Sequence, residues 1–108
     1  MGIENKACKQ DEVRALSEPE VTKLLREVPQ WSFKDRAIGR EFRFKDFKEA
    51  MEFVNRVAAL AEAEDHHPDI CISYNIVRLT LSTHKVGGLS CKDFILGAKI
   101  NLAAESGR

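Results

Sequence analysis

Residues 70–82 have the sequence ICISYNIVRLTLS, and this stretch decides how the chain is organised. In residues 77–82 apolar and polar side chains alternate, which is the period of two expected for a half-buried β-strand. Residues 70–74 form a shorter apolar-rich run that also fits a strand. Asn75 tolerates the positive φ of a tight turn, so we predict an antiparallel hairpin around it.

A long helix is predicted directly before this hairpin. Asp46 is suited to be its N-cap, and apolar residues follow at the spacing of one helical face. These residues are Phe47, Ala50, Met51, Val54, Val57, Ala58 and Ala61. The residue before a proline is disfavoured in the α region, so the helix is expected to end near His66 and His67, before Pro68.

A second hairpin and an N-terminal helix are predicted further upstream. Residues 38–44 alternate between apolar and polar, and residues 31–33 are their expected partner across a turn near residues 34–36. Ser17 and Glu20 have the spacing of a capping box at the start of a helix.

The final helix is expected to begin at Ser90, with Asp93 in the position of a second capping box. The predicted order is helix, two strands, long helix, two strands, helix. This order predicts an α+β two-layer domain, in which a four-stranded antiparallel sheet carries about three helices on one face. We expect residues 1–15 to be a flexible tail and residues 16–108 to form a single domain.

The composition excludes several classes of function. Lys and Arg number 17 and Asp and Glu number 17, so the formal net charge is zero, which argues against direct nucleic-acid binding. A balanced charge is compatible with self-association. No apolar run approaches the ~20 residues that cross a bilayer. Cys8, Cys71 and Cys91 are odd in number and lack CxxC spacing, which favours a reducing compartment, the cytoplasm, over a disulfide framework.

The three histidines of the chain are His66, His67 and His84, and they flank the predicted hairpin. The start of its first strand and the end of its second lie at the same end of the sheet. The histidines are therefore expected to line one cleft. Imidazoles can supply both an acid and a base near pH 7, each worth ~10²–10⁴ in rate.

Structural roles are the alternative for each of these residues. His66 alone could simply be a favourable charge near a helix C-terminus, and Glu62 makes an ordinary i, i+4 contact with it. Asp93 could serve only as a helix cap, and Tyr74 could pack as a strand aromatic. Three histidines and a carboxylate could also hold zinc, although adjacent imidazoles diverge and no HExxH spacing is present.

The spacing of these residues resembles the signature of the pterin-4a-carbinolamine dehydratases, also called 4a-hydroxytetrahydrobiopterin dehydratases. The matching residues are Glu62-x3-His66-His67-Pro68-x5-Tyr74-x9-His84-x8-Asp93. The resemblance covers roughly residues 17–103. It implies a lyase without cofactor or metal that dehydrates 4a-hydroxytetrahydropterin to quinonoid dihydropterin, in the recycling of tetrahydrobiopterin after aromatic amino-acid hydroxylation.

The resemblance also implies which residues form the site. The catalytic residues would be His66, His67, His84 and Asp93. The residues that bind the substrate would be Asp65, His66, His67, Ser82, Thr83, His84 and Lys85. Asp93 is expected to orient His84. We expect His66 and His84 to exchange protons while His67 mainly binds the pterin.

The partners expected from the resemblance are the pterin substrate and further copies of the chain. Relatives of this kind form dimers that join their sheets edge to edge, sometimes paired into tetramers. A functional link to an aromatic amino-acid hydroxylase is also implied. The alternative function is that of a binding module, because some members of the family act as dimerisation cofactors for a homeodomain transcription factor.

Overall fold

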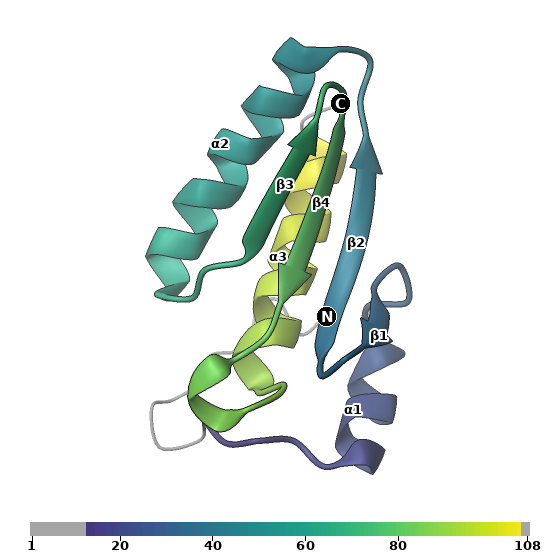
Figure 1. The fold of residues 1–108 in the computed structure, drawn as a ribbon, viewed down its shortest axis with the longest axis vertical. Coiled ribbons are helices and arrows are strands. Elements are labelled where there is room, and N and C mark those ends of the chain that lie inside the picture. Colours follow the sequence, from purple (N-terminus) through teal and green to yellow (C-terminus); the bar gives the residue numbers. More distant parts are fainter. Residues whose placement is uncertain (1–12, 107–108) are drawn as a thin grey trace.

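The computed structural model describes residues 13–106, which form three α-helices, four strands and one short 3₁₀-helix. Figure 1 shows their arrangement. In chain order the elements are α1 (Glu18–Leu25), β1 (Ser32–Lys34), β2 (Ala37–Arg43), α2 (Phe47–Glu64), β3 (Asp69–Ser73), β4 (Ile76–Leu81), η3 (His84–Val86) and α3 (Cys91–Ser106).

The strands form one antiparallel sheet in the order β1-β2-β4-β3. Both predicted hairpins are present, and β2 joins them by pairing with β4, from Ile38 opposite Leu81 to Arg43 opposite Ile76. The long helices α2 and α3 lie on one face of this sheet, while α1 lies at the end near β1 (Figure 1). The predicted α+β class is confirmed.

The core lies between the sheet and the two long helices. Along β4 the side chains of Val77, Leu79 and Leu81 are buried, whereas those of Arg78 and Thr80 are exposed. The alternation that predicted the strand therefore separates a covered face from an open one. Aromatic rings complete the core, with Phe42 of β2 and Phe44, just after that strand, each packed against Phe53 of α2.

Local hydrogen bonds explain where two of the helices begin. Ser17 and Glu20 make the predicted capping box, in which each side chain accepts a bond from the other residue's backbone N–H. Asp46 accepts from the N–H of Glu49 at 2.9 Å and is the predicted N-cap of α2. Both helices start where the sequence indicated, because the caps satisfy N–H groups that lack helical partners.

The turn between β3 and β4 differs from its prediction. The positive φ falls on Tyr74, at 54°, and not on Asn75. Asn75 instead donates its side-chain amide to the carbonyl of Phe44 at 2.8 Å, which ties the turn to the end of β2. Tyr74 is exposed and does not pack as a strand aromatic.

The segment before α1 is held in place by specific bonds. The predicted tail lies mostly at residues 1–12, outside the described part of the chain, but Arg14 makes two hydrogen bonds to Glu20, at 2.9 and 2.6 Å. These bonds lower the pKa of the Glu20 carboxyl to about 2, assisted by bonds from Ser17. The N–H of Leu16 also donates to the carbonyl of Leu89 at 2.9 Å. Residues 13–16 therefore have defined contacts with the domain.

The cysteines do not all remain thiols. Cys71 is free and exposed on β3, whereas Cys91 is disulfide-bonded. The sequence favoured a reducing compartment over a disulfide framework, and the disulfide at Cys91 departs from that expectation. No helix within residues 13–106 is long and apolar enough to cross a membrane.

Candidate active site

The end of α2 separates the two adjacent histidines. Asp65 adopts the left-handed conformation, with φ at 51°, and its N–H donates to Glu62 O, while the N–H of His66 donates to Ala61 O. This is the Schellman motif, which reverses the chain direction at a helix C-terminus. The helix is therefore ended by these two hydrogen bonds and not by the steric effect of Pro68 on the residue before it. After this reversal His66 is buried and His67 is exposed.

His66 is paired with a buried carboxylate. Its Nε2 lies 2.6 Å from Oδ1 of Asp93, and the exposed fractions of the two side chains are 10% and 0%. Asp93 belongs to the first turn of α3, so this bond joins the end of one long helix to the start of the other. The prediction that Asp93 orients His84 is wrong, because its partner is His66.

The second oxygen of Asp93 is also bound. Its Oδ2 accepts a hydrogen bond from the hydroxyl of Thr83 at 2.8 Å and one from the N–H of Ser90 at 3.0 Å. The bond from Ser90 is the predicted capping contact at the start of α3, so Asp93 caps the helix and holds a histidine at once. A carboxylate that accepts from several donors in a buried site has a fixed orientation.

His84 is placed by a short closed loop after β4. It begins η3, and the loop closes where the N–H of Thr83 donates to the carbonyl of Gly88 at 2.7 Å. Gly87 supplies the left-handed conformation that this closure needs, with φ at 70°. The imidazole of His84 is exposed.

His67 lies at the outer edge of the group. Its Nε2 is 2.5 Å from Oε2 of Glu62, five residues earlier in the last turn of α2, and both side chains are exposed. The predicted contact of Glu62 with a histidine is therefore present, but with His67 in place of His66. Tyr74 lies in the turn after β3, whereas His66 and His67 precede that strand, so the structure does not bring Tyr74 to the histidines.

A cavity of about 360 Å³ brings the three histidines together. Its lining residues are Val13, Asp65, His66, His67, Ser82, Thr83, His84, Lys85 and Lys92. This set contains every residue that was expected to bind substrate. The volume falls within the ~300–1,000 Å³ typical of small-molecule sites.

Two residues of the cavity were missed in the sequence. Lys92 directly precedes Asp93 in the first turn of α3, so its position beside a candidate site residue was a usable signal. Val13 carries no such signal, because only the contacts of the segment before α1 bring it to the cavity. Among residues 13–106 no group of three or more His, Cys, Asp or Glu side chains is placed to hold a metal ion.

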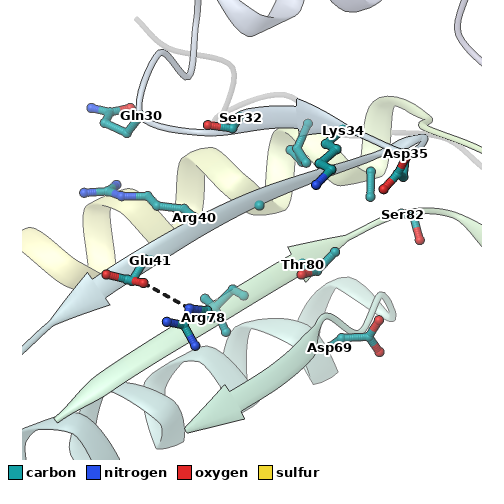
Figure 2. A pocket seen from close by; sticks show the side chains of 14 residues that line it. Gln30, Ser32, Lys34, Asp35, Arg40, Glu41, Asp69, Arg78, Thr80 and Ser82 are labelled. Carbon is teal, nitrogen blue, oxygen red and sulfur yellow. Dashed lines mark hydrogen bonds and ion pairs between the residues drawn. The ribbon is translucent and has the colours of Figure 1, made fainter. Parts of the chain in front are cut away.

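A second hollow, of about 660 Å³, lies on the open face of the sheet (Figure 2). It is crossed by an ion pair between Arg78 of β4 and Glu41 of β2, whose atoms Nε and Oε1 are 3.0 Å apart. Gly39 lines it without a side chain, and Ser82 lines both hollows. The two cavities therefore adjoin at the end of β4, but the histidines belong only to the smaller one.

The fold and the cavity together define an α+β protein with a histidine–carboxylate pair beside two further imidazoles, a set of groups that can transfer protons near neutral pH. A family model described as "Pterin 4 alpha carbinolamine dehydratase" matches residues 14–103. The chain belongs to the pterin-4-alpha-carbinolamine dehydratase family, and this membership places it among the hydro-lyases.

Relatives of similar length support the assignment. A provisionally named pterin-4-alpha-carbinolamine dehydratase of Nitrosospira multiformis is 43% identical over 101 residues, covering 92% of this chain and 89% of the relative. A protein of the same provisional name in Chloroflexus aurantiacus is 52% identical over 86 residues, covering 80% and 92%.

Solved structures share the fold. The crystal structure of a "transcriptional coactivator/pterin dehydratase" from Brucella melitensis has a TM-score of 0.81 and 39% identity, covering 84% of this chain and 99% of that one. A pterin dehydratase-like protein described as a RuBisCO assembly factor in the alpha-carboxysome has a TM-score of 0.58 and 21% identity, covering 68% and 86%. This second similarity shows the fold alone.

Proposed function

We propose that the chain dehydrates 4a-hydroxytetrahydropterin to quinonoid dihydropterin and water, using histidines as general acid and base. The observation that carries the proposal is the cavity in which His66, His67 and His84 meet. Family membership supplies the substrate class, and the cavity supplies groups of the right chemistry.

The reaction needs only proton transfers. The lone pair of the ring nitrogen forms a double bond to C4a, and the C–O electron pair leaves with the hydroxyl oxygen. That oxygen takes one proton and departs as water, while the nitrogen gives one proton to a base. No electrons are lost or gained, so imidazoles suffice for both steps.

The environments of the histidines support a division of roles. His66 has its Nε2 held by Asp93, and among residues 13–106 no hydrogen bond engages its Nδ1. His66 and the exposed His84 exchange protons with the substrate. His67, which is paired with Glu62 at the rim, mainly binds the pterin, together with Asp65, Ser82 and Lys85.

A rate measurement tests the reaction. Freshly generated 4a-hydroxytetrahydropterin is mixed with the protein, and the loss of its absorbance is followed with and without a chelator. We expect dehydration well above the uncatalysed rate, unchanged by the chelator. A rate equal to the uncatalysed one would contradict the proposal, and activity that the chelator abolishes and zinc restores would replace it with a metal mechanism.

The reaction would belong to tetrahydrobiopterin recycling beside an aromatic amino-acid hydroxylase, which would supply the substrate. The cytoplasm is the proposed compartment. The free thiol of Cys71 fits a reducing environment, whereas the disulfide of Cys91 does not. Counting free thiols in protein alkylated within intact cells tests this location, and a Cys91 that resists alkylation in the cell would contradict it.

A binding role is the second candidate, because the Brucella protein is described as both a coactivator and a pterin dehydratase. Such a role would not depend on catalysis. A His84→Ala variant that loses dehydration but restores the growth of a deletion strain would favour the binding module. A variant that fails in both assays would favour the enzyme.

A further inference from the structure

The hydroxyl of Thr83 makes hydrogen bonds to two other side chains of the protein. Its Oγ1 lies 2.8 Å from Oδ2 of Asp93 and donates to it, and it also lies 2.7 Å from Oγ of Ser90. A hydroxyl has one hydrogen, so once Thr83 donates to Asp93 it can only accept from Ser90. The direction of the chain is therefore fixed: Ser90 donates to Thr83, and Thr83 donates to Asp93.

The three side chains of this hydrogen-bonded chain are buried. Thr83, Ser90 and Asp93 have exposed fractions of 7%, 0% and 0%. Buried polar groups need protein partners, and each of these three side chains has one. Thr83 borders the cavity, but the one hydrogen of its hydroxyl is taken by Asp93 and cannot also be donated to a ligand.

The same residues connect two parts of the site. The backbone of Thr83 closes the loop that carries His84, through its bond to Gly88. Its side chain holds Asp93, which in turn holds His66. Removal of one hydroxyl would therefore loosen the carboxylate without removing any imidazole.

We propose that Thr83 and Ser90 are positioning residues, whose hydroxyl chain orients Asp93 so that His66 keeps a proton on Nε2 and presents an unprotonated Nδ1 to the cavity. This reassigns Thr83 from substrate binding to the support of His66. The tautomer follows from the carboxylate that this chain holds in place, because a carboxylate can only accept, and the 2.6 Å contact therefore requires the Nε2–H of the ring. The catalytic consequence rests on the proposed dehydratase function.

Kinetics of four variants test the positioning role. Thr83→Val and Ser90→Ala should each lower kcat by about 10–100-fold, by analogy with the loss of an outer hydrogen-bond partner of a metal-binding histidine, with KM little changed. Thr83→Ser keeps the hydroxyl and should retain most of kcat. Thr80→Val, on the exposed face of β4, is the matched control and should behave as wild type.

Opposite kinetic results would overturn the proposal. A Thr83→Val protein with raised KM and normal kcat would make Thr83 a substrate contact. A Thr83→Ser protein as slow as Thr83→Val would show that the hydroxyl is not what matters. If Thr83→Val does not fold, Ser90→Ala carries the same test, because it removes only the first donor of the chain.

A measurement without substrate separates this inference from the proposed reaction. The ¹⁵N shifts of the His66 ring should show a protonated Nε2 and an unprotonated Nδ1 in the wild type. In Thr83→Val and Ser90→Ala the two tautomers should mix, and the Nε2 proton should exchange faster with water. Unaltered His66 signals in both variants would overturn the positioning role. Altered signals in a protein without dehydratase activity would support it and contradict only the proposed function.

Discussion

Two neighbouring residues of this chain have opposite environments. The side chain of His66 is 10% exposed and that of His67 is 57% exposed, although only one peptide bond separates them. The difference arises at Asp65, whose left-handed conformation turns the chain so that one imidazole meets Asp93 and the next meets Glu62. An Asp tolerates this conformation better than most residues with a side chain.

The first prediction concerns the three imidazoles. Replacement of His66 or His84 by alanine should lower kcat by ~10²-fold or more, because each removes a proton-transfer group. His67→Ala should mainly raise KM, because this side chain is at the rim. Steady-state kinetics of the purified variants provide the measurement. Near-wild-type kcat/KM in all three would show that the cavity is not the catalytic centre.

At the scale of single elements, the β1–β2 hairpin stores strain in its turn. Asp35 and Arg36 have φ values of 52° and 63°, the positive values that a two-residue I′ turn requires. Neither residue is a glycine, so their side chains disfavour these φ values. The pairing of the flanking strands, with Lys34 opposite Ala37, keeps the turn in this conformation.

Arg36→Gly should therefore raise the free energy of unfolding by about 1 kcal/mol, because glycine adopts positive φ without the side-chain clash. Urea unfolding followed by circular dichroism measures the change. The control is Ala59→Gly at an exposed position in the middle of α2, which should lower stability by about 1 kcal/mol. A loss of stability in Arg36→Gly would mean that the Arg36 side chain makes an important contact.

The contact between Arg14 and Glu20 gives α1 a pH dependence. The pKa of Glu20 falls from 4.5 to about 2 in the folded protein, first because of the hydrogen bond from Arg14. A lowered folded-state pKa contributes stability above the unfolded value, so this contribution is present above pH 4.5 and is lost as the pH falls from 4.5 towards 2.

Arg14→Ala should therefore raise the pKa of Glu20 towards 4.5, although the bonds from Ser17 remain. An NMR titration of the Glu20 side-chain carboxyl measures this pKa. Arg26→Ala, just after α1, is the control and should leave it at about 2. The same Glu20 midpoint in wild type and Arg14→Ala would show that the pair does not persist in solution.

At the scale of the whole molecule, the sheet has one long unprotected edge. All five residues of β3 are exposed, and Ile70 and Ile72 present apolar side chains beside unpaired backbone groups. Such an edge is a template for pairing with another strand. The other edge, β1, is only three residues long.

We therefore predict that two copies join through β3, and light scattering at micromolar concentration should give at least twice 12.2 kDa. Ile72→Lys should shift the equilibrium towards the monomer, because a charge on an edge strand opposes pairing. Phe33→Lys, at an exposed apolar residue of β1, is the matched control and should leave the oligomer intact. A wild-type protein of 12.2 kDa would contradict the prediction.

Much of this fold is determined by neighbouring residues, and the sequence therefore predicts it. Alternation along residues 77–82 selects the buried face of β4, and the caps at Ser17 and Asp46 start two helices through bonds that span three residues. The sequence also predicts the β3–β4 hairpin, which brings the start of β3 beside the end of β4, and the histidines flank these two points. The observed pairing of Asp69 with Thr80 has this arrangement.

The partner of Asp93 was decided only by the tertiary structure. The family resemblance implied that Asp93 orients His84, but the carboxylate bonds His66, 27 positions away. That choice depends on the packing of α2 against α3 and on the reversal at Asp65, and neither leaves a periodic signal in the sequence. A hydrogen bond needs its atoms placed within a few tenths of an ångström. Spacing along the chain can predict which groups meet, whereas only the packed core decides which atoms bond.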